Sequence, residues 1–228
     1  MKTRDSTSRT PYWAVIFDWD GVLVDSSRQH EKSWRRLARD EGLPLFPDFF
    51  LQTFGMKNEW IIPHILHWTE DPKEIVRLSL RKEALFREIV GEEGIALCPG
   101  ALAWCRDLAA LSVPAAIGSS TQRANIELVL EKLALRPFFR TIVAAEDVSL
   151  GKPDPEVFLL AASLLRVPPD RCVVFEDAPA GVEAAKRAGM RVVALTTTRP
   201  PEALREADRI LSDLSASSPC EIERGLFP

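Results

Sequence analysis

The sequence has few of the residues that mark several large classes of protein. Its 228 residues include four cysteines and three histidines. The cysteines follow neither a CxxC pattern nor the spacing of a metal site; they are Cys98, Cys105, Cys172 and Cys220. Sparse cysteines of this kind are typical of reduced core thiols in a cytoplasmic protein. So few histidines exclude a metal centre built mainly from histidine.

Long hydrophobic runs and an excess of positive charge are also missing. No segment approaches about 18 consecutive apolar residues, so we expect no membrane span. The basic, polar residues 1–10 lead into no apolar core, which argues against a signal peptide, and we expect residues 1–11 to form a frayed tail. The balance of 29 basic and 33 acidic residues gives a net charge of -4. This charge argues against nucleic acid or an anionic membrane as the main partner.

Short apolar runs recur along the chain and are bounded by turn residues. They lie at residues 13–17, 113–117, 141–145, 172–175 and 191–195. Each run is continuous rather than alternating, as expected for strands buried on both faces. Segments with helical spacing separate them. The sequence therefore predicts an α/β fold, a doubly wound, Rossmann-like parallel sheet with helices on both faces.

One interval interrupts this alternation of strands and helices. From Gly21 to about Cys98 no run resembles a strand, and the spacing of apolar residues is helical instead. The first expected helix begins after a cap at Ser26 or Ser27 and ends at Gly42, and two more cover residues 59–68 and 73–90. We therefore expect an inserted helical domain.

This insertion divides the chain into two domains. Residues 25–95 form the predicted helical domain, and residues 1–24 and 96–228 together form the predicted sheet domain.

Polar residues follow the ends of four predicted strands. In chain order they are Asp18 and Asp20, Ser119 and Ser120, Lys152 within GKPDP, and Glu176 and Asp177. Open parallel sheets bind ligands beyond the carboxyl ends of their strands, so we expect these side chains to converge. Four carboxylates packed together need a cation, and an all-oxygen set favours Mg²⁺ over zinc. Magnesium with a lysine and hydroxyl donors makes a site for a phosphate group.

Each of these features also has a simpler structural explanation. A lone DxD is usually a turn with solvated acids, and GKPDP alone is usually a loop. Ser119 and the pair Glu176-Asp177 could each cap a helix. Their occurrence together, at four strand ends in one order, favours a shared site.

The same residues resemble the four ordered motifs of a known superfamily. FDWDGVLVDS at residues 17–26, Ser119, Lys152 and VFEDAPAG at residues 174–181 resemble the haloacid dehalogenase-like hydrolases. The resemblance is to the branch that contains β-phosphoglucomutases and small sugar-phosphate phosphatases, and it covers residues 13 to about 214. It implies that the insertion is a helical cap that closes over the site.

The resemblance also implies roles for the acidic residues. Asp18 would be the nucleophile that forms an aspartyl-phosphate intermediate, and Asp20 the general acid and then the general base. Mg²⁺ would be held by Asp18, the backbone carbonyl of Asp20 and Asp177, with Glu176 nearby or acting through water. Dehalogenases and phosphonate-cleaving members lack the second aspartate, so Asp20 implies phosphoester chemistry.

Further roles fall to residues that would bind the phosphoryl group. Ser119 and Lys152 would bind its oxygens, and the backbone amide of Ser120 would assist them.

The predicted cap carries the candidates for substrate selection. FGMKNE at residues 54–59 occupies the position of the family's substrate-specificity loop, so Gly55 and Asn58 are candidate contacts. β-Phosphoglucomutases carry a lysine before that glycine and an arginine three residues after it, where this chain has Phe54 and Asn58. Lys82 matches a cap lysine of mutases and related phosphatases, but a solvated helix lysine explains it equally well.

We therefore predict a Mg²⁺-dependent phosphatase of a small phosphorylated metabolite, cytoplasmic and a monomer or weak dimer. A sugar-phosphate mutase is the alternative, and the departures at Phe54 and Asn58 count against it. A phospho-acceptor domain of the receiver type would be much shorter and would lack the insertion. A catalytically silent binding protein would normally have lost one of the four motifs, and none is lost.

Overall fold

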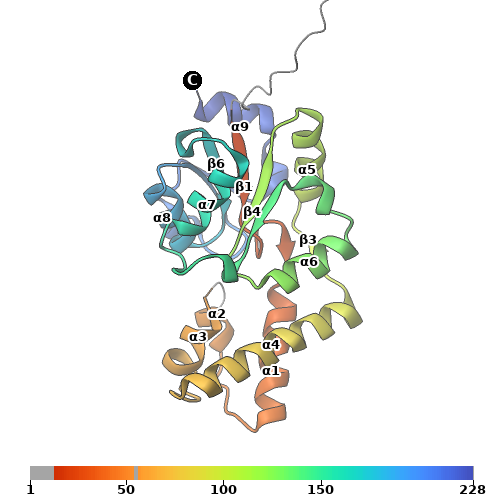
Figure 1. The fold of residues 1–228 in the computed structure, drawn as a ribbon, viewed down its shortest axis with the longest axis vertical. Coiled ribbons are helices and arrows are strands. Elements are labelled where there is room, and N and C mark those ends of the chain that lie inside the picture. The colour runs from red at the N-terminus through yellow and green to blue at the C-terminus, as the bar shows by residue number, and fades with distance from the viewer. Residues whose placement is uncertain (1–12, 54–55, 228) are drawn as a thin grey trace, which may run out of the picture.

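The computed structural model describes residues 13–53 and 56–227. Within them, six strands form one parallel sheet in the order β5-β4-β1-β6-β7-β8 (Figure 1). The strands are β1 (Ala14–Phe17), β4 (Ala115–Gly118), β5 (Thr141–Val143), β6 (Cys172–Glu176), β7 (Arg191–Leu195) and β8 (Arg209–Leu211). Each of the five predicted runs overlaps a strand, with β4 and β6 extending one residue beyond their runs. The predicted α/β fold is therefore confirmed.

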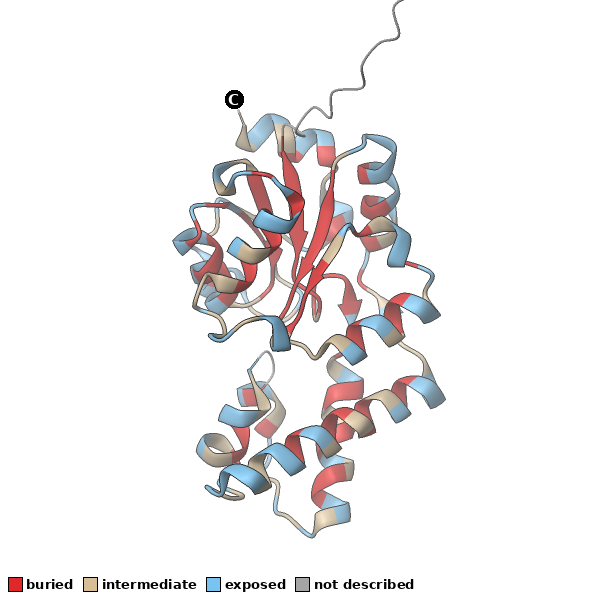
Figure 2. Ribbon diagram, viewed as in Figure 1, coloured by how far each residue is buried: buried red, intermediate tan, exposed pale blue. Residues whose placement is uncertain are grey.

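Helices cover both faces of this sheet. The helices are α5 (Ala101–Ala110), α6 (Arg123–Lys132), α7 (Glu156–Leu165), α8 (Pro179–Arg187) and α9 (Pro219–Leu226). Successive side chains of β1 point to opposite faces, as in any strand. Val15 and Phe17 join the core formed with α5, α6 and α9, whereas Ala14 and Ile16 join the core formed with α7 and α8. The strands are accordingly buried on both sides (Figure 2).

The position of β1 in the sheet determines where the motif residues lie. β1 pairs with β4 on one side and with β6 on the other, so it is central. The backbone amide of Asp18 donates to the carbonyl of Phe175 at 2.9 Å, which continues this pairing one residue beyond the strand. The first and fourth motifs therefore begin next to each other at the carboxyl edge of the sheet.

The segment between the first strand and α5 is mainly helical and has a core of its own. Its helices are α1 (Ser27–Glu41), α2 (Phe49–Thr53), α3 (Asn58–Trp60) and α4 (Pro72–Glu93), with a π-helical turn at Ile61–Ile65. Gly42 ends α1 in the left-handed conformation (φ 67°), as its position in the sequence predicted. We call Ser27–Glu93 the helical unit. It lies beyond the carboxyl edge of the sheet (Figure 1).

The prediction that this interval contains no strand is wrong. β2 (Val24–Asp25) and β3 (Ala96–Leu97) form a two-stranded antiparallel ribbon where the chain enters and leaves the helical unit. With two residues each, these strands are too short to give a recognisable pattern. The ribbon lies at the boundaries of the predicted domains, whose division remains an interpretation.

Other expectations from composition have mixed outcomes. Cys98, Cys105 and Cys172 are free and buried, as predicted, but Cys220 is exposed on α9, so the prediction of a core thiol is wrong there. Across the described residues, no helix is long and apolar enough to cross a membrane. The frayed tail predicted for residues 1–11 lies outside the described residues.

The core of the helical unit yields a stability prediction. Leu85 on α4 is fully buried among Trp34, Leu37 and the other apolar residues of this unit. We expect Leu85→Ala to lower the free energy of unfolding by about 2–5 kcal/mol, because the lost methyl groups leave a cavity. Urea denaturation measures this change. Leu80→Ala on the same helix is the control: its side chain is 56% exposed, so its effect should stay within about 0.5 kcal/mol.

Candidate active site

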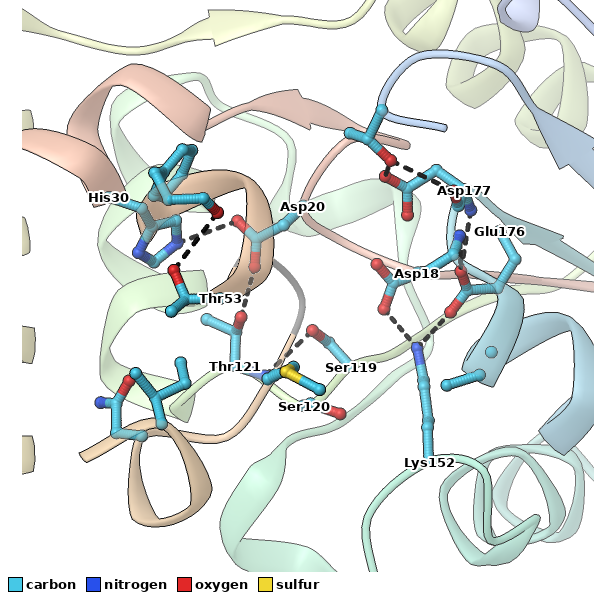
Figure 3. A pocket seen from close by; sticks show the side chains of 18 of the residues that line it. Asp18, Asp20, His30, Thr53, Ser119, Ser120, Thr121, Lys152, Glu176 and Asp177 are labelled. Atoms are coloured by element: carbon cyan, nitrogen blue, oxygen red, sulfur yellow. Dashed lines mark hydrogen bonds and ion pairs between the residues drawn. The ribbon is translucent and has the colours of Figure 1, made fainter. Parts of the chain in front are cut away.

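The side chains predicted to converge do meet at the carboxyl edge of the sheet (Figure 3). Carboxylate oxygens of Asp18, Glu176 and Asp177 all lie within 4.8 Å of one another, and all three residues are buried. Asp18 follows β1, and the other two end and follow β6. Parallel pairing of these two strands therefore brings acidic residues from distant parts of the sequence into one cluster.

Lys152 supplies a positive charge to this cluster. Its Nζ lies 2.5 Å from Oδ1 of Asp18 and 2.6 Å from Oε1 of Glu176. The ammonium also lies 4.8 Å from the centre of the Phe158 ring on α7. Burial alone would lower the pKa of Lys152, but the two carboxylates outweigh it, and the pKa is raised. Lys152 is therefore charged at any physiological pH.

One lysine does not neutralise all of these acids. Burial, together with the charges of Glu176 and Asp20, raises the pKa of Asp18 to about 7 against the lowering effect of Lys152. Burial and the charges of Glu176 and Asp18 also raise the pKa of Asp177 well above its usual value. An all-oxygen cluster with unbalanced negative charge is the chemistry that a divalent hard cation satisfies. The residues present therefore fit Mg²⁺.

The carboxylate of Glu176 is held by its own backbone. Oε2 accepts hydrogen bonds from the amides of Asp177 (2.7 Å) and Ala178 (2.8 Å), at the start of α8. The same carboxylate lies against the Cα of Gly181 on the first turn of that helix, where a Cβ would overlap it. The glycine of the fourth motif thus makes the space that the acid occupies.

Asp20 lies apart from this cluster and has three donors of its own. Its carboxylate accepts hydrogen bonds from the hydroxyls of Ser26 and Thr121, and His30 Nε2 lies 3.3 Å from Oδ1. Burial acts to raise the pKa of Asp20, but His30 and the two hydroxyls outweigh it and lower the pKa to about 2. Asp20 is therefore ionised in this arrangement.

The role of Ser26 differs from the one expected. Ser26 does occupy the cap position of α1, but its side chain makes no cap hydrogen bond, because its hydroxyl donates to Asp20. The prediction of a side-chain cap is wrong at this residue. Thr121 and His30 were not predicted as site residues, since neither belongs to a spacing pattern that links it to Asp20.

Two threonines after β7 complete the acidic side of the site and were also missed by sequence reasoning. The Thr198 hydroxyl contacts the Asp177 carboxylate and lies 3.1 Å from the Asp177 carbonyl oxygen. The Thr197 hydroxyl donates to the carbonyl of Gly21 at 2.6 Å. These bonds tie the loop after β7 to the first and fourth motifs.

Ser119 and Ser120 lie beside the same cavity, after β4. The Ser119 hydroxyl oxygen accepts from the amide of Thr121 at 3.1 Å, as a local turn would require. Its own proton remains available to a ligand, because a hydroxyl both accepts and donates. Ser119 does not cap α6, whose cap position is occupied by Gln122, so the explanation of Ser119 as a helix cap is wrong.

The helical unit contributes two of its three predicted residues to the cavity. Lys82 and Asn58 both line it. Lys82 is buried, so its interpretation as a solvated helix lysine is wrong. Gly55 and Phe54 lie outside the described residues.

The cavity itself has a volume of about 90 Å³ and lies between the sheet edge and the helical unit. Phe50, Thr198 and Arg199 also line an adjoining cavity of about 570 Å³. The smaller space suits a group of phosphoryl size next to Asp18, and the larger one extends away from it.

Comparison with known proteins agrees with this geometry. The family model of the haloacid dehalogenase-like hydrolases matches residues 12–189. The chain therefore belongs to the haloacid dehalogenase-like hydrolases.

Its relatives place it in the β-phosphoglucomutase-like branch of that family. It is 36% identical over 213 residues to the chloroplastic 5-amino-6-(5-phospho-D-ribitylamino)uracil phosphatase of Arabidopsis thaliana, covering 92% of this chain but 57% of the plant protein. It is 35% identical over 206 residues to the validoxylamine A 7'-phosphate phosphatase of Streptomyces hygroscopicus subsp. limoneus, covering 90% of this chain and 95% of that protein. The crystal structure of β-phosphoglucomutase from Clostridium difficile superposes with a TM-score of 0.83 at 26% identity, covering 95% and 97% of the two chains.

The contact between Gly181 and Glu176 yields a prediction. We expect Gly181→Ala to lower the free energy of unfolding by about 1–3 kcal/mol, because the new methyl group must displace a buried carboxylate. Gly91→Ala on α4 is the matched control, since nothing lies within 4 Å of its Cβ position. That change should stabilise the protein by about 0.5–1 kcal/mol. Equal effects in urea denaturation would contradict the assignment.

Proposed function

We propose that this protein is a Mg²⁺-dependent phosphatase of small phosphorylated metabolites that acts through an aspartyl-phosphate on Asp18. The observation that carries the proposal is the pairing of two aspartates with different environments at one cavity. Asp18 lies beside Lys152 in the acidic cluster, whereas Asp20, two residues later, is held separately by hydroxyls and His30. Two carboxyl groups with different roles are what nucleophilic catalysis with acid–base assistance requires.

In the first step, a carboxylate oxygen of Asp18 attacks phosphorus while the bond to the leaving oxygen breaks. The leaving oxygen takes a proton from Asp20. With a pKa of about 2, Asp20 is ionised as it stands here. Delivery of a proton therefore requires Asp20 to exchange some of its contacts with Ser26, Thr121 and His30 for contact with the substrate.

In the second step, water attacks the phosphorus of the aspartyl-phosphate. Asp20 accepts the proton that the water loses, and the bond between phosphorus and the Asp18 oxygen breaks. Inorganic phosphate leaves and the Asp18 carboxylate is restored. The proton that Asp20 gains here replaces the one that it donated to the leaving group.

Lys152, Ser119 and the amide of Ser120 bind the phosphoryl oxygens in this scheme. Lys152 already lies within hydrogen-bonding distance of Asp18, so it can contact an oxygen of a phosphoryl group attached there. Positive charge and oriented donors at this position stabilise the charge that develops during transfer.

The acidic cluster would hold the metal ion. Asp18, Asp177 and the backbone carbonyl of Asp20 would be ligands, with Glu176 nearby or acting through water. When bound, Mg²⁺ would neutralise the carboxylates and polarise a phosphoryl oxygen.

The helical unit acts as a cap in this proposal and selects the substrate. The names of the two phosphatase relatives describe the phosphate of a ribitylamino-uracil and the 7'-phosphate of validoxylamine A. Such a leaving group could extend from the small cavity into the adjoining one. A cytoplasmic location and a monomeric or weakly dimeric state stay predictions.

The decisive experiment combines a substrate panel with one variant. Purified protein is assayed with Mg²⁺ against p-nitrophenyl phosphate, alditol phosphates such as ribitol 5-phosphate, sugar phosphates and nucleotides. We expect turnover of at least one metabolite, and we expect Asp18→Asn to reduce kcat by about 10³-fold or more while circular dichroism stays unchanged. The amide is nearly isosteric with the carboxylate but is a poor nucleophile. Activity within tenfold of wild type would rule out covalent catalysis by Asp18.

The same panel tests the mutase alternative. With β-glucose 1-phosphate and a bisphosphate activator, a mutase would form glucose 6-phosphate. We expect free phosphate to be released from at least one metabolite faster than this isomer appears. The opposite ranking would favour the mutase.

Metal dependence gives a separate prediction. We expect EDTA to abolish activity and Asp177→Ala to weaken the apparent affinity for Mg²⁺ by about tenfold or more, as loss of groups at a metal site does. Lys152→Ala should impair turnover with a smaller effect on that affinity, because its ammonium cannot be a ligand. Titration of activity with Mg²⁺ compares the two variants. Full activity in EDTA would contradict the metal assignment.

A further inference from the structure

Beyond the residues of the four motifs, Glu83 has the most elaborate set of contacts at the cavity. Its side chain is buried, and donors from three helices converge on it. Oε1 accepts from Nδ2 of Asn58 on α3 at 2.7 Å and from Nζ of Lys82 on α4 at 2.9 Å. Oε2 accepts from Nδ2 of Asn125 on α6 at 2.5 Å. Both carboxylate oxygens are therefore used.

Asn125 belongs to the sheet domain, so this contact crosses between the two parts of the molecule. It is fully buried, and its Oδ1 accepts from the guanidinium of Arg87 on α4 at 2.8 Å. Glu83 and Arg87 lie one helical turn apart on the same side of α4. Together they hold both ends of one amide group on α6. We call Glu83, Arg87 and Asn125 the clasp.

The clasp is continuous with the site through Lys82. The Lys82 ammonium also lies 2.7 Å from Nδ1 of His30, whose Nε2 is the atom next to Asp20. An ammonium group only donates, so Nδ1 accepts and Nε2 carries the proton that faces Asp20. A chain of hydrogen bonds thus runs from Asn125 on α6 to Asp20. Its intermediate members are Glu83, Lys82 and His30.

Glu83 also orients the amide of Asn58. Because Nδ2 donates to Glu83, the carbonyl oxygen Oδ1 is left as the acceptor that Asn58 can offer to a ligand. An acceptor at this position suits a substrate hydroxyl, whereas it would repel a second phosphate.

Glu83 does more than neutralise the charge of Lys82. Arg81 and Glu88 form an ordinary ion pair on α4, at 3.2 Å and with both side chains 41% exposed, and touch no residue of the site. Glu83 instead gathers donors from α3 and α6 besides its neighbour Lys82. Its burial costs solvation that a simple surface pair would avoid.

We propose that Glu83 is a positioning residue, which holds Lys82 and the acceptor oxygen of Asn58 toward the leaving group when the helical unit is joined to α6 through Asn125. The proposal rests on the phosphatase function and adds the residue that positions the groups facing the leaving group. Glu83 acts through its neighbours and need not touch the substrate.

The test compares two variants with a control on the same helix. Glu83→Gln removes the charge, and Asn125→Ala removes the contact from the other side without altering the helical unit. Glu88→Gln is the control, since it makes the same chemical change at an exposed position of α4. Each protein is assayed with Mg²⁺ on p-nitrophenyl phosphate, which lacks hydroxyls, and on the best alditol phosphate of the panel. Hydrogen–deuterium exchange of residues 58–60 is measured without substrate.

We expect both variants to raise KM for the alditol phosphate by about tenfold or more, as misplacement of binding groups does, while kcat on p-nitrophenyl phosphate stays within about threefold. The double variant should raise KM no more than the single variant with the larger increase does, because both changes break the same contact. Exchange at residues 58–60 should accelerate in both variants but not in Glu88→Gln.

Parallel losses on both substrates, multiplicative effects in the double variant, or unchanged exchange would each overturn the proposal. If Glu83→Gln does not fold, because Lys82 is then buried without a partner charge, Asn125→Ala decides alone. Failure of the wild type to hydrolyse any phosphomonoester would instead contradict the phosphatase function. The exchange measurement needs no turnover, so it still tests the clasp in that case.

Discussion

The ammonium group of Lys152 between Asp18 and Glu176 is the contact on which the acidic edge of the sheet depends. Parallel pairing of β1 with β6 forces carboxylates from two motifs into one buried cluster. Without a buried positive charge, these acids would repel one another or take up protons. Lys152 relieves part of this repulsion, but the pKa of Asp18 stays raised, first by burial and then by the charges of Glu176 and Asp20. The fold therefore places all side chains of the site, but the cluster still carries more negative than positive charge.

A second polar system lies on the other side of the cavity and follows a different principle. Around Asp20, the hydroxyls of Ser26 and Thr121 and the ring of His30 stabilise the ionised carboxylate. Around Glu83, the Lys82 ammonium supplies an opposing charge, and two side-chain amides add hydrogen bonds. At the sheet edge, several carboxylates form one cluster. At the interface with the helical unit, the carboxylates of Asp20 and Glu83 lie apart, and each is held by its own set of hydrogen bonds.

Local pattern explains which features could be predicted from the sequence. The five buried strands and the four motifs follow from short apolar runs and the polar residues after them. The sixth strand, β8, was missed because it lies at the sheet edge, is half-buried and begins with Arg209. Thr121 and Thr198 could not be given a role in the site, because each depends on a partner brought close by tertiary folding, and Ser26 lies in the first motif but was expected only as a helix cap. A hydroxyl has no spacing signature that distinguishes a surface residue from one bonded to a buried carboxylate of the site.

The β2–β3 ribbon has a consequence for how such enzymes diversify. Because Val24 pairs with Leu97, the chain leaves the sheet domain and returns to it at adjacent points. Everything between these points could be lengthened, shortened or exchanged without moving a strand of the six-stranded sheet. Selection could therefore act on the inserted segment as a replaceable module while the phosphoryl chemistry at the sheet edge stays constant. Under the proposed function, the two-residue ribbon thus separates the helical unit, which would select the substrate, from the sheet edge, which would carry the reaction.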